Sequence, residues 1–152
     1  LILAQNPELL ILDDFSLGLD PGYRRLFVDY LRDYARSENK TVFLTSHIIQ
    51  DMERLIDDCI IMDYGSILIQ QPIETLMKGL RKYTCTVPEG YQPQLPMTCY
   101  HPAVIRQTLE TYSFLPPSDV EGLLKENQVP FTGLQHENVS LEDAFIGLTG
   151  KY

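Results

Sequence analysis

The amino-acid sequence predicts an α/β fold, with a parallel sheet in the first 82 residues and a small α+β region in residues 83–152. Along the first part, short apolar runs alternate with stretches of helical periodicity, the order expected of a sheet with helical crossovers. Polar side chains follow two of the apolar runs directly, at the carboxyl ends where such sheets place their chemistry. After residue 82 prolines become frequent and the regular alternation ends. We therefore treat residues 83–152 as a separate accessory region.

The first strand and the helix after it carry clear local signals. Leu9–Leu12 is a continuous apolar run, as expected of a strand buried on both faces of a sheet. Asp20 stands at an N-cap position, and Pro21 follows at the first helical position, where its missing N–H costs nothing. One apolar stripe of this helix is predicted to pack in the core, and it consists of Tyr23, Leu26, Phe27, Tyr30, Leu31 and Tyr34.

The remainder of the first region continues the alternation of strands and helices. Its apolar and β-branched runs are bounded by turn-forming residues, which is typical of short buried strands. The predicted elements are a strand at 41–45, a short helix within 48–56, a hairpin of strands at 59–62 and 66–70 around a turn at Tyr64 and Gly65, and a helix opened by Pro72. Cys59 is predicted to be buried in its strand.

The accessory region shows weaker periodicity. Two Ser-x-x-acid patterns indicate capping boxes, in which a Ser side chain and an acidic side chain satisfy each other's backbone N–H groups. The predicted elements are strands at 83–87 and within 104–114, a helix capped by Ser118 and Glu121, a strand at 131–135, and a last helix capped by Ser140 and Asp143. His101 and His136 have no partner pattern and are predicted to be surface residues.

Composition narrows the possible classes of protein. The chain has 152 residues, of which 44% are hydrophobic and 22% charged, as in a globular protein. Its net charge of −9 argues against a protein that wraps nucleic acid. No apolar run approaches the roughly 20 residues of a bilayer span, and no signal-peptide pattern is visible. Three cysteines without CxxC spacing predict neither a disulfide framework nor a zinc site, and favour a reducing, cytoplasmic setting.

The start of the sequence indicates a larger context. Residues 1–5 have the pattern of a helix end, stopped by Asn6 and Pro7. We therefore expect the chain to be a piece of a longer protein, whose other part would complete the site described next.

Candidate site residues lie at the ends of the first two predicted strands. Asp13 and Asp14 follow the first strand, and Ser46 and His47 follow the second. Adjacent carboxylates repel each other unless a cation lies nearby, and Mg²⁺ is often held by one or two carboxylates together with a substrate phosphate. The second acid could orient or deprotonate an attacking water, and His47 could approach a phosphate from the side. These residue types suit phosphoryl transfer, which depends on positioning and charge stabilisation.

The order LLILDD, SLGLDP and TSH resembles the second half of an ABC-type ATPase domain, a P-loop NTPase with a parallel-sheet core. The resemblance implies that Asp13 is the Walker B metal-side carboxylate and that Asp14 occupies the position of the catalytic acid. Residues 16–20, including Ser16 and Asp20, would form the nucleotide-side D-loop, and His47 would be the switch histidine. The ending SLEDAFIGLTG resembles the subgroup that energises ABC-2-type exporters. Residues 84–136 resemble no family that we can name.

The resemblance also implies a function and partners. It suggests an ATPase that uses ATP and Mg²⁺ and couples ATP binding and hydrolysis to export. Its partners would be a second ATP-binding domain and a transmembrane permease subunit, with no nucleic acid. Its place would be the cytoplasm, peripheral to the inner (plasma) membrane.

The sequence departs from the family pattern in two respects. Asp14 stands where the family usually has Glu, and Phe15 stands where it usually has Pro. Aspartate is one methylene shorter, so we hypothesise slow hydrolysis. In addition, the Walker A loop, the Q-loop and the signature motif are not found in these 152 residues. We therefore expect this chain on its own to be inactive.

Other interpretations remain open. Asp13 and Asp14 could simply end a strand and begin a turn, although capping needs only one acid. A phospho-acceptor receiver domain also places an acidic pair at a strand end, but it needs an acceptor Asp at the next strand end, where this chain has TSH. A degenerate ABC ATPase that serves as a regulatory or binding module, and a non-transport ABC protein, are the remaining alternatives.

Overall fold

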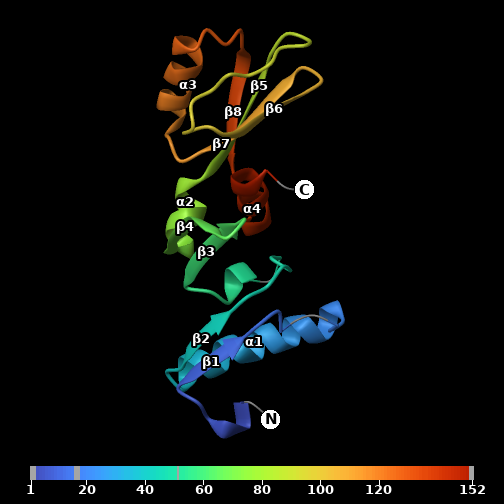
Figure 1. The fold of residues 1–152 in the computed structure, drawn as a ribbon, viewed down its shortest axis with the longest axis vertical. Helices are drawn as coiled ribbons and strands as arrows, with labels where there is room; N and C mark the ends of the chain where they lie inside the picture. The colour runs from blue at the N-terminus through green and yellow to red at the C-terminus, as the bar shows by residue number, and fades with distance from the viewer. Residues whose placement is uncertain (1–2, 16–17, 51, 151–152) are drawn as a thin grey trace. The chain divides into compact units, whose positions relative to one another are not determined.

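A computed structural model describes residues 3–15, 18–50 and 52–150 of the chain. It contains two compact units, Leu1–Ile56 and Asp57–Tyr152 (Figure 1). Both units mix helices and strands, which agrees with the predicted mixed α/β content. Among the described residues, the parallel sheet predicted for residues 1–82 is present only as the pairing of residues 9–12 with residues 41–44.

The first unit is a β–α–β arrangement. Strand β1 (Leu9–Leu12) pairs in parallel with β2 (Thr41–Leu44), and helix α1 (Pro21–Ser37) connects them and lies against them (Figure 1). A short 3₁₀ turn, η1 (Leu3–Gln5), precedes β1. The core of this unit is formed by Leu10, Leu12 and Leu31, with Phe27, Tyr34, Val42 and Leu44 packed around them.

Helix α1 begins as predicted but buries a narrower face than predicted. The Asp20 side chain accepts hydrogen bonds from the backbone N–H groups of Gly22 (2.9 Å) and Tyr23 (3.4 Å), which confirms the N-cap. The predicted core stripe is wrong at three positions, because Tyr23, Leu26 and Tyr30 are 70%, 66% and 57% exposed. Val28 and Leu31 are buried instead. The apolar residues of α1 form a broad band, and a pair of strands covers only one side of it.

The first strand pair is also buried on one face only. Leu10 and Leu12 face α1, whereas Leu9 and Ile11 are 52% and 69% exposed, and Phe43 on β2 is 54% exposed. The prediction of burial on both faces is therefore wrong for the structure as described. Within the described ranges, parallel pairing is confined to β1 and β2, and the other sheets are antiparallel.

The segment after β2 is less helical than predicted. In place of a helix within 48–56, the described part contains a single 3₁₀ turn, η2 (Met52–Arg54). The Ser46 side chain donates to the Ile48 carbonyl and accepts from the Ile48 N–H, at 3.1 and 3.0 Å. Because this side chain occupies backbone groups that a helix would use, it favours a turn at this point.

The second unit begins with the predicted hairpin. Strands β3 (Asp58–Asp63) and β4 (Ser66–Pro72) pair antiparallel, and helix α2 (Ile73–Gly79) follows. Tyr64 and Gly65 at the turn have φ values of 45° and 78°, which suits a tight hairpin turn whose two central residues both have positive φ. The buried position of Cys59 on β3 is confirmed.

A four-stranded antiparallel sheet in the order β6-β7-β5-β8 forms the rest of this unit. Its strands are β5 (Arg81–Thr86), β6 (Tyr100–Ile105), β7 (Thr108–Ser113) and β8 (Thr132–Asn138). The strands predicted at 83–87 and 131–135 are confirmed, and the weak signal in 104–114 corresponds to β7 and the end of β6. The core of this unit comprises Tyr83, Cys85, Val87, Leu109, Val120, Leu124 and Val129.

Helices α3 (Pro117–Glu126) and α4 (Leu141–Thr149) begin in different ways. The predicted capping box at Ser118 is wrong: the N-cap is Pro116, and Ser118 lies inside the helix with its hydroxyl on Asp119. The capping box of Ser140 and Asp143 is confirmed. Proline at the first helical position already fixes the backbone of α3, so its start does not need a side-chain cap.

Candidate functional site

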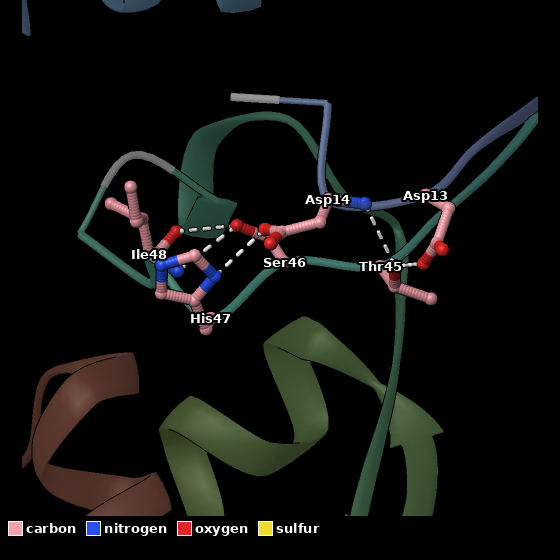
Figure 2. A network of polar contacts seen from close by, with 6 residues as sticks. All are labelled: Asp13, Asp14, Thr45, Ser46, His47 and Ile48. Carbon is pink, nitrogen blue, oxygen red and sulfur yellow. Dashed lines mark hydrogen bonds and ion pairs between the residues drawn. The ribbon is translucent and has the colours of Figure 1, made fainter. Parts of the chain in front are cut away.

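The candidate site lies in the first unit, where β1 and β2 end at the same edge (Figure 2). The parallel ladder continues one step beyond the strands: the Thr45 N–H donates to the Leu12 carbonyl (2.9 Å), and the Asp14 N–H donates to the Thr45 carbonyl (3.1 Å). This pairing brings together two segments separated by about thirty residues, and it confirms that the predicted polar residues gather at one edge.

Asp14 and His47 form the closest contact between predicted site residues. The Nδ1 atom of His47 lies 2.7 Å from Oδ1 of Asp14, and the two side chains are 60% and 36% exposed. Because an ionised carboxylate can only accept, Nδ1 carries the proton of this hydrogen bond. Among the described residues, no other group is hydrogen-bonded to His47.

The backbone of Asp14 is unusual. Its φ of 42° lies in the left-handed region, which Asp tolerates better than most residues. Its side chain reaches His47 from this conformation (Figure 2). Phe15, which stands in place of the usual proline, packs on Phe27 of α1 with ring centroids 5.3 Å apart and so holds the loop against the helix.

Thr45 is a part of the site that sequence reasoning missed. Its hydroxyl donates to Oδ1 of Asp13 and accepts the Asp14 N–H at 3.0 Å (Figure 2). The available signal was its place at the end of the second predicted strand, beside the two acids. The sequence pattern predicts Thr45 only as a strand residue and Ser46 as the first polar site residue after the strand. Ser46 instead uses its hydroxyl on the backbone of Ile48.

Asp20 and Ser16 are the remaining predicted site residues. Asp20 caps α1, and Ser16 lies outside the described residues. His101 and His136 are exposed, as predicted: His101 contacts the Leu148 carbonyl at 3.2 Å, and the His136 ring lies against Tyr83.

The acids at this edge suit a metal that brings other ligands with it. Across residues 3–15, 18–50 and 52–150, no group of three or more His, Cys, Asp or Glu side chains could hold a metal ion. One Asp13 oxygen is bound by Thr45, and the other accepts no hydrogen bond from a described residue. An exposed carboxylate with one free oxygen fits Mg²⁺, which keeps several waters and takes one or two carboxylates together with substrate phosphates.

Comparison with known proteins gives the chain clear relatives. It is 32% identical over 160 aligned residues to the Nod factor export ATP-binding protein I of Ralstonia nicotianae, covering 98% of this chain and 49% of that protein. It is 37% identical over 81 residues to the energy-coupling factor transporter ATP-binding protein EcfA2 of Staphylococcus aureus, covering 53% of this chain and 28% of that protein. The EcfA2 protein of Clostridioides difficile is 41% identical over 66 residues, which cover 43% of this chain and 23% of that protein.

These matches differ in extent. The chain spans about half the length of the Ralstonia protein, and the aligned segments cover about a quarter of the EcfA2 proteins. The Ralstonia match extends through residues 84–136, for which the sequence alone offered no resemblance. No protein-family profile matches the chain.

Proposed function

Since the homologues of this chain are ABC transporter ATP-binding proteins, and it matches their C-terminal part, we propose that it supplies part of an ATP-hydrolysing site that drives export across a membrane. The observation that carries this proposal is the convergence of Asp13, Asp14 and His47 at one sheet edge, with Asp14 and His47 2.7 Å apart. In this proposal residues 1–82 belong to the ATPase domain and residues 83–152 form an accessory region.

The contacts of Asp13, Asp14 and His47 support a role for each of these residues. The free oxygen of Asp13 would hold the hydration shell of Mg²⁺. Mg²⁺ would neutralise the charge that develops on the phosphates during transfer. Asp14 would orient the attacking water, and its hydrogen bond fixes the His47 ring so that Nε2 can face the γ-phosphate. Ser16 and Asp20 would contribute to the nucleotide side of the D-loop.

The proposal extends to partners. A second ATP-binding domain would complete the nucleotide sites, and a transmembrane permease subunit would carry the substrate. None of the helices in the described ranges has the length and apolar character of a membrane span. The proposed location is the cytoplasmic side of the inner (plasma) membrane. The parts of the site that bind the phosphates would come from outside these 152 residues, so this chain alone would be inactive.

A regulatory or binding role is the second candidate, and one observation favours it. Asp14 replaces the longer Glu, and its carboxylate is already engaged by His47. The short side chain of Asp14 and its hydrogen bond to His47 would then both limit the contact of this carboxylate with the attacking water. Nucleotide binding would persist, but hydrolysis would be slow.

One assay on the intact protein separates these candidates. We expect Asp13→Asn to lower magnesium-dependent single-turnover ATP hydrolysis by at least about 100-fold, because a misplaced catalytic group already costs this much. Asp33→Asn, the same change on an exposed α1 residue, is the control and should leave the rate unchanged. If the short side chain of Asp14 limits hydrolysis, Asp14→Glu should raise the single-turnover rate.

Two results would count against these assignments. An intact protein without magnesium-dependent nucleotide binding rules out the ATPase function. Binding without hydrolysis, in both the wild type and Asp14→Glu, favours the regulatory module.

A further inference from the structure

One hydroxyl group links the two adjacent acids. Thr45 Oγ1 donates a hydrogen bond to the Asp13 carboxylate and accepts one from the backbone N–H of Asp14 (Figure 2). A hydroxyl has one hydrogen to donate and two lone pairs to accept with, so a single Thr can make both bonds. A Val of the same shape could make neither.

The bond to Asp13 restricts which carboxylate oxygen is available. Oδ1 is held by the Thr45 hydroxyl, and Oδ2 accepts no hydrogen bond from any residue in the described part of the chain. Threonine is β-branched and stiff about χ1, which keeps the hydroxyl in place. A hydrogen bond of this kind, from a neighbouring side chain to a metal-binding carboxylate, fixes the orientation of the free oxygen.

The bond to Asp14 supports a backbone conformation that most residues avoid. The Asp14 N–H is shared between the carbonyl and the hydroxyl of Thr45, at 3.1 and 3.0 Å. Two acceptors from one residue anchor the backbone at φ 42°, the conformation from which the Asp14 side chain reaches His47.

We propose that Thr45 is a positioning residue, which orients the Asp13 carboxylate toward a hydrated divalent cation and sets the backbone from which Asp14 reaches His47. This role rests on the proposed function. It is distinct from a contribution to folding, because Thr45 is exposed and a Val would suit the position directly after β2, where the strand pairing continues, equally well. Thr41, at the start of β2, is also exposed, and no described residue makes a hydrogen bond to its side chain, so it offers a matched control.

The test compares Thr45→Val, Thr45→Ser and Thr41→Val in the intact protein. The first measurement is the Mg²⁺ concentration for half-maximal binding of a fluorescent ATP analogue, and the second is the single-turnover rate at saturating Mg²⁺ and ATP. We expect Thr45→Val to raise the half-maximal Mg²⁺ concentration, or to lower the single-turnover rate, by about 10- to 100-fold. This is the usual effect of removing a group that orients a metal ligand. Thr45→Ser keeps the hydroxyl and should stay close to wild type, and Thr41→Val should match wild type.

Hydrogen–deuterium exchange supplies a readout that does not depend on activity. In the intact protein, the peptide containing Asp14 should exchange faster in Thr45→Val than in wild type, and no faster in Thr41→Val. If Thr45→Val shows wild-type Mg²⁺ dependence, rate and exchange while the wild type binds nucleotide, the role of Thr45 is overturned. If the wild type itself shows no magnesium-dependent binding, the proposed function fails and the role fails with it.

Discussion

The sheet of the first unit and the four-stranded sheet of the second unit are buried to different extents. In Leu1–Ile56, β1 and β2 are covered on one face by α1, and Leu9, Ile11 and Phe43 on the other face are more than half exposed. In Asp57–Tyr152, the four-stranded sheet packs against α3 around fully buried side chains such as Tyr83 and Leu124, each 1% exposed. Buried apolar area is the main source of stability. The second unit therefore has an extensive apolar core of its own. The first unit, which contains the candidate site, has a smaller core.

The largest expected difference between the units is the cost of removing an aliphatic side chain. Leu124→Ala should lower the free energy of unfolding by about 2–5 kcal/mol, because it leaves a cavity in the core of the second unit. Ile11→Thr, which keeps β-branching on an exposed position of the first unit, should change it by less than about 0.5 kcal/mol. Urea unfolding followed by far-UV circular dichroism measures both.

A large cost for Ile11→Thr would change the comparison. It would mean that the outer face of β1 is covered in the protein under the assay conditions, and that the first unit is better packed than its exposed side chains indicate.

Helix α4 provides a sharper test, within the second unit. A Cβ atom on Gly147 would lie 2.4 Å from the Tyr112 ring. A Cβ on Gly122 in α3 would have no described atom within 4 Å beyond its chain neighbours and the backbone of its own helix. Gly147→Ala should therefore destabilise the protein by about 1–3 kcal/mol through overpacking. Gly122→Ala should stabilise it by about 0.5–1 kcal/mol, because alanine is the better helix former. Thermal unfolding of both variants measures the sign of each change in stability. Equal changes in the two variants would show that α4 does not pack closely on Tyr112.

Local signals in the sequence predicted local structure well. Asp20 before Pro21 marked the start of α1, Ser140 with Asp143 marked that of α4, and Tyr64 with Gly65 marked the hairpin turn. Each of these features depends on contacts within a few residues. The information needed is therefore present in a short window of sequence.

Predictions that depended on tertiary contacts were less successful. The stripe with Tyr23 and Tyr30 has helical spacing, but spacing does not reveal how much of the helix the neighbouring strands cover. The segment after Thr45 has apolar spacing too, but the Ser46 side chain competes for its backbone. For the candidate site, the gathering of Asp13, Asp14 and His47 was predictable because parallel strands end at one edge. The contribution of Thr45 was not, since it depends on hydrogen bonds between strands.

The smallest expected effect concerns an ion pair of the second unit. Lys82 lies 2.8 Å from Glu110, and both side chains are about one quarter exposed. The hydrogen bond to Glu110 raises the pKa of Lys82 above its usual 10.5, with further increases from the charges of Glu110, Glu137 and Asp143, while burial acts in the opposite direction. A raised pKa in the folded state means that the pair stabilises the protein fully below pH 10.5, and that this stabilisation is lost as the pH rises through the folded-state value.

Lys82→Gln should therefore lower the free energy of unfolding at pH 8 by about 0.2–1 kcal/mol, the range for partly exposed pairs. The difference from wild type should shrink at pH 11. Burial raises the pKa of Cys59, Cys85 and Cys99 as well, but these thiols are common to both proteins and cancel in the comparison. Lys78→Gln is the control, because Lys78 and Glu74 form an exposed pair within one helix. Urea unfolding at the two pH values measures the change. A Lys82→Gln difference that stays constant between pH 8 and pH 11 would show that the charge on Lys82 does not stabilise this unit.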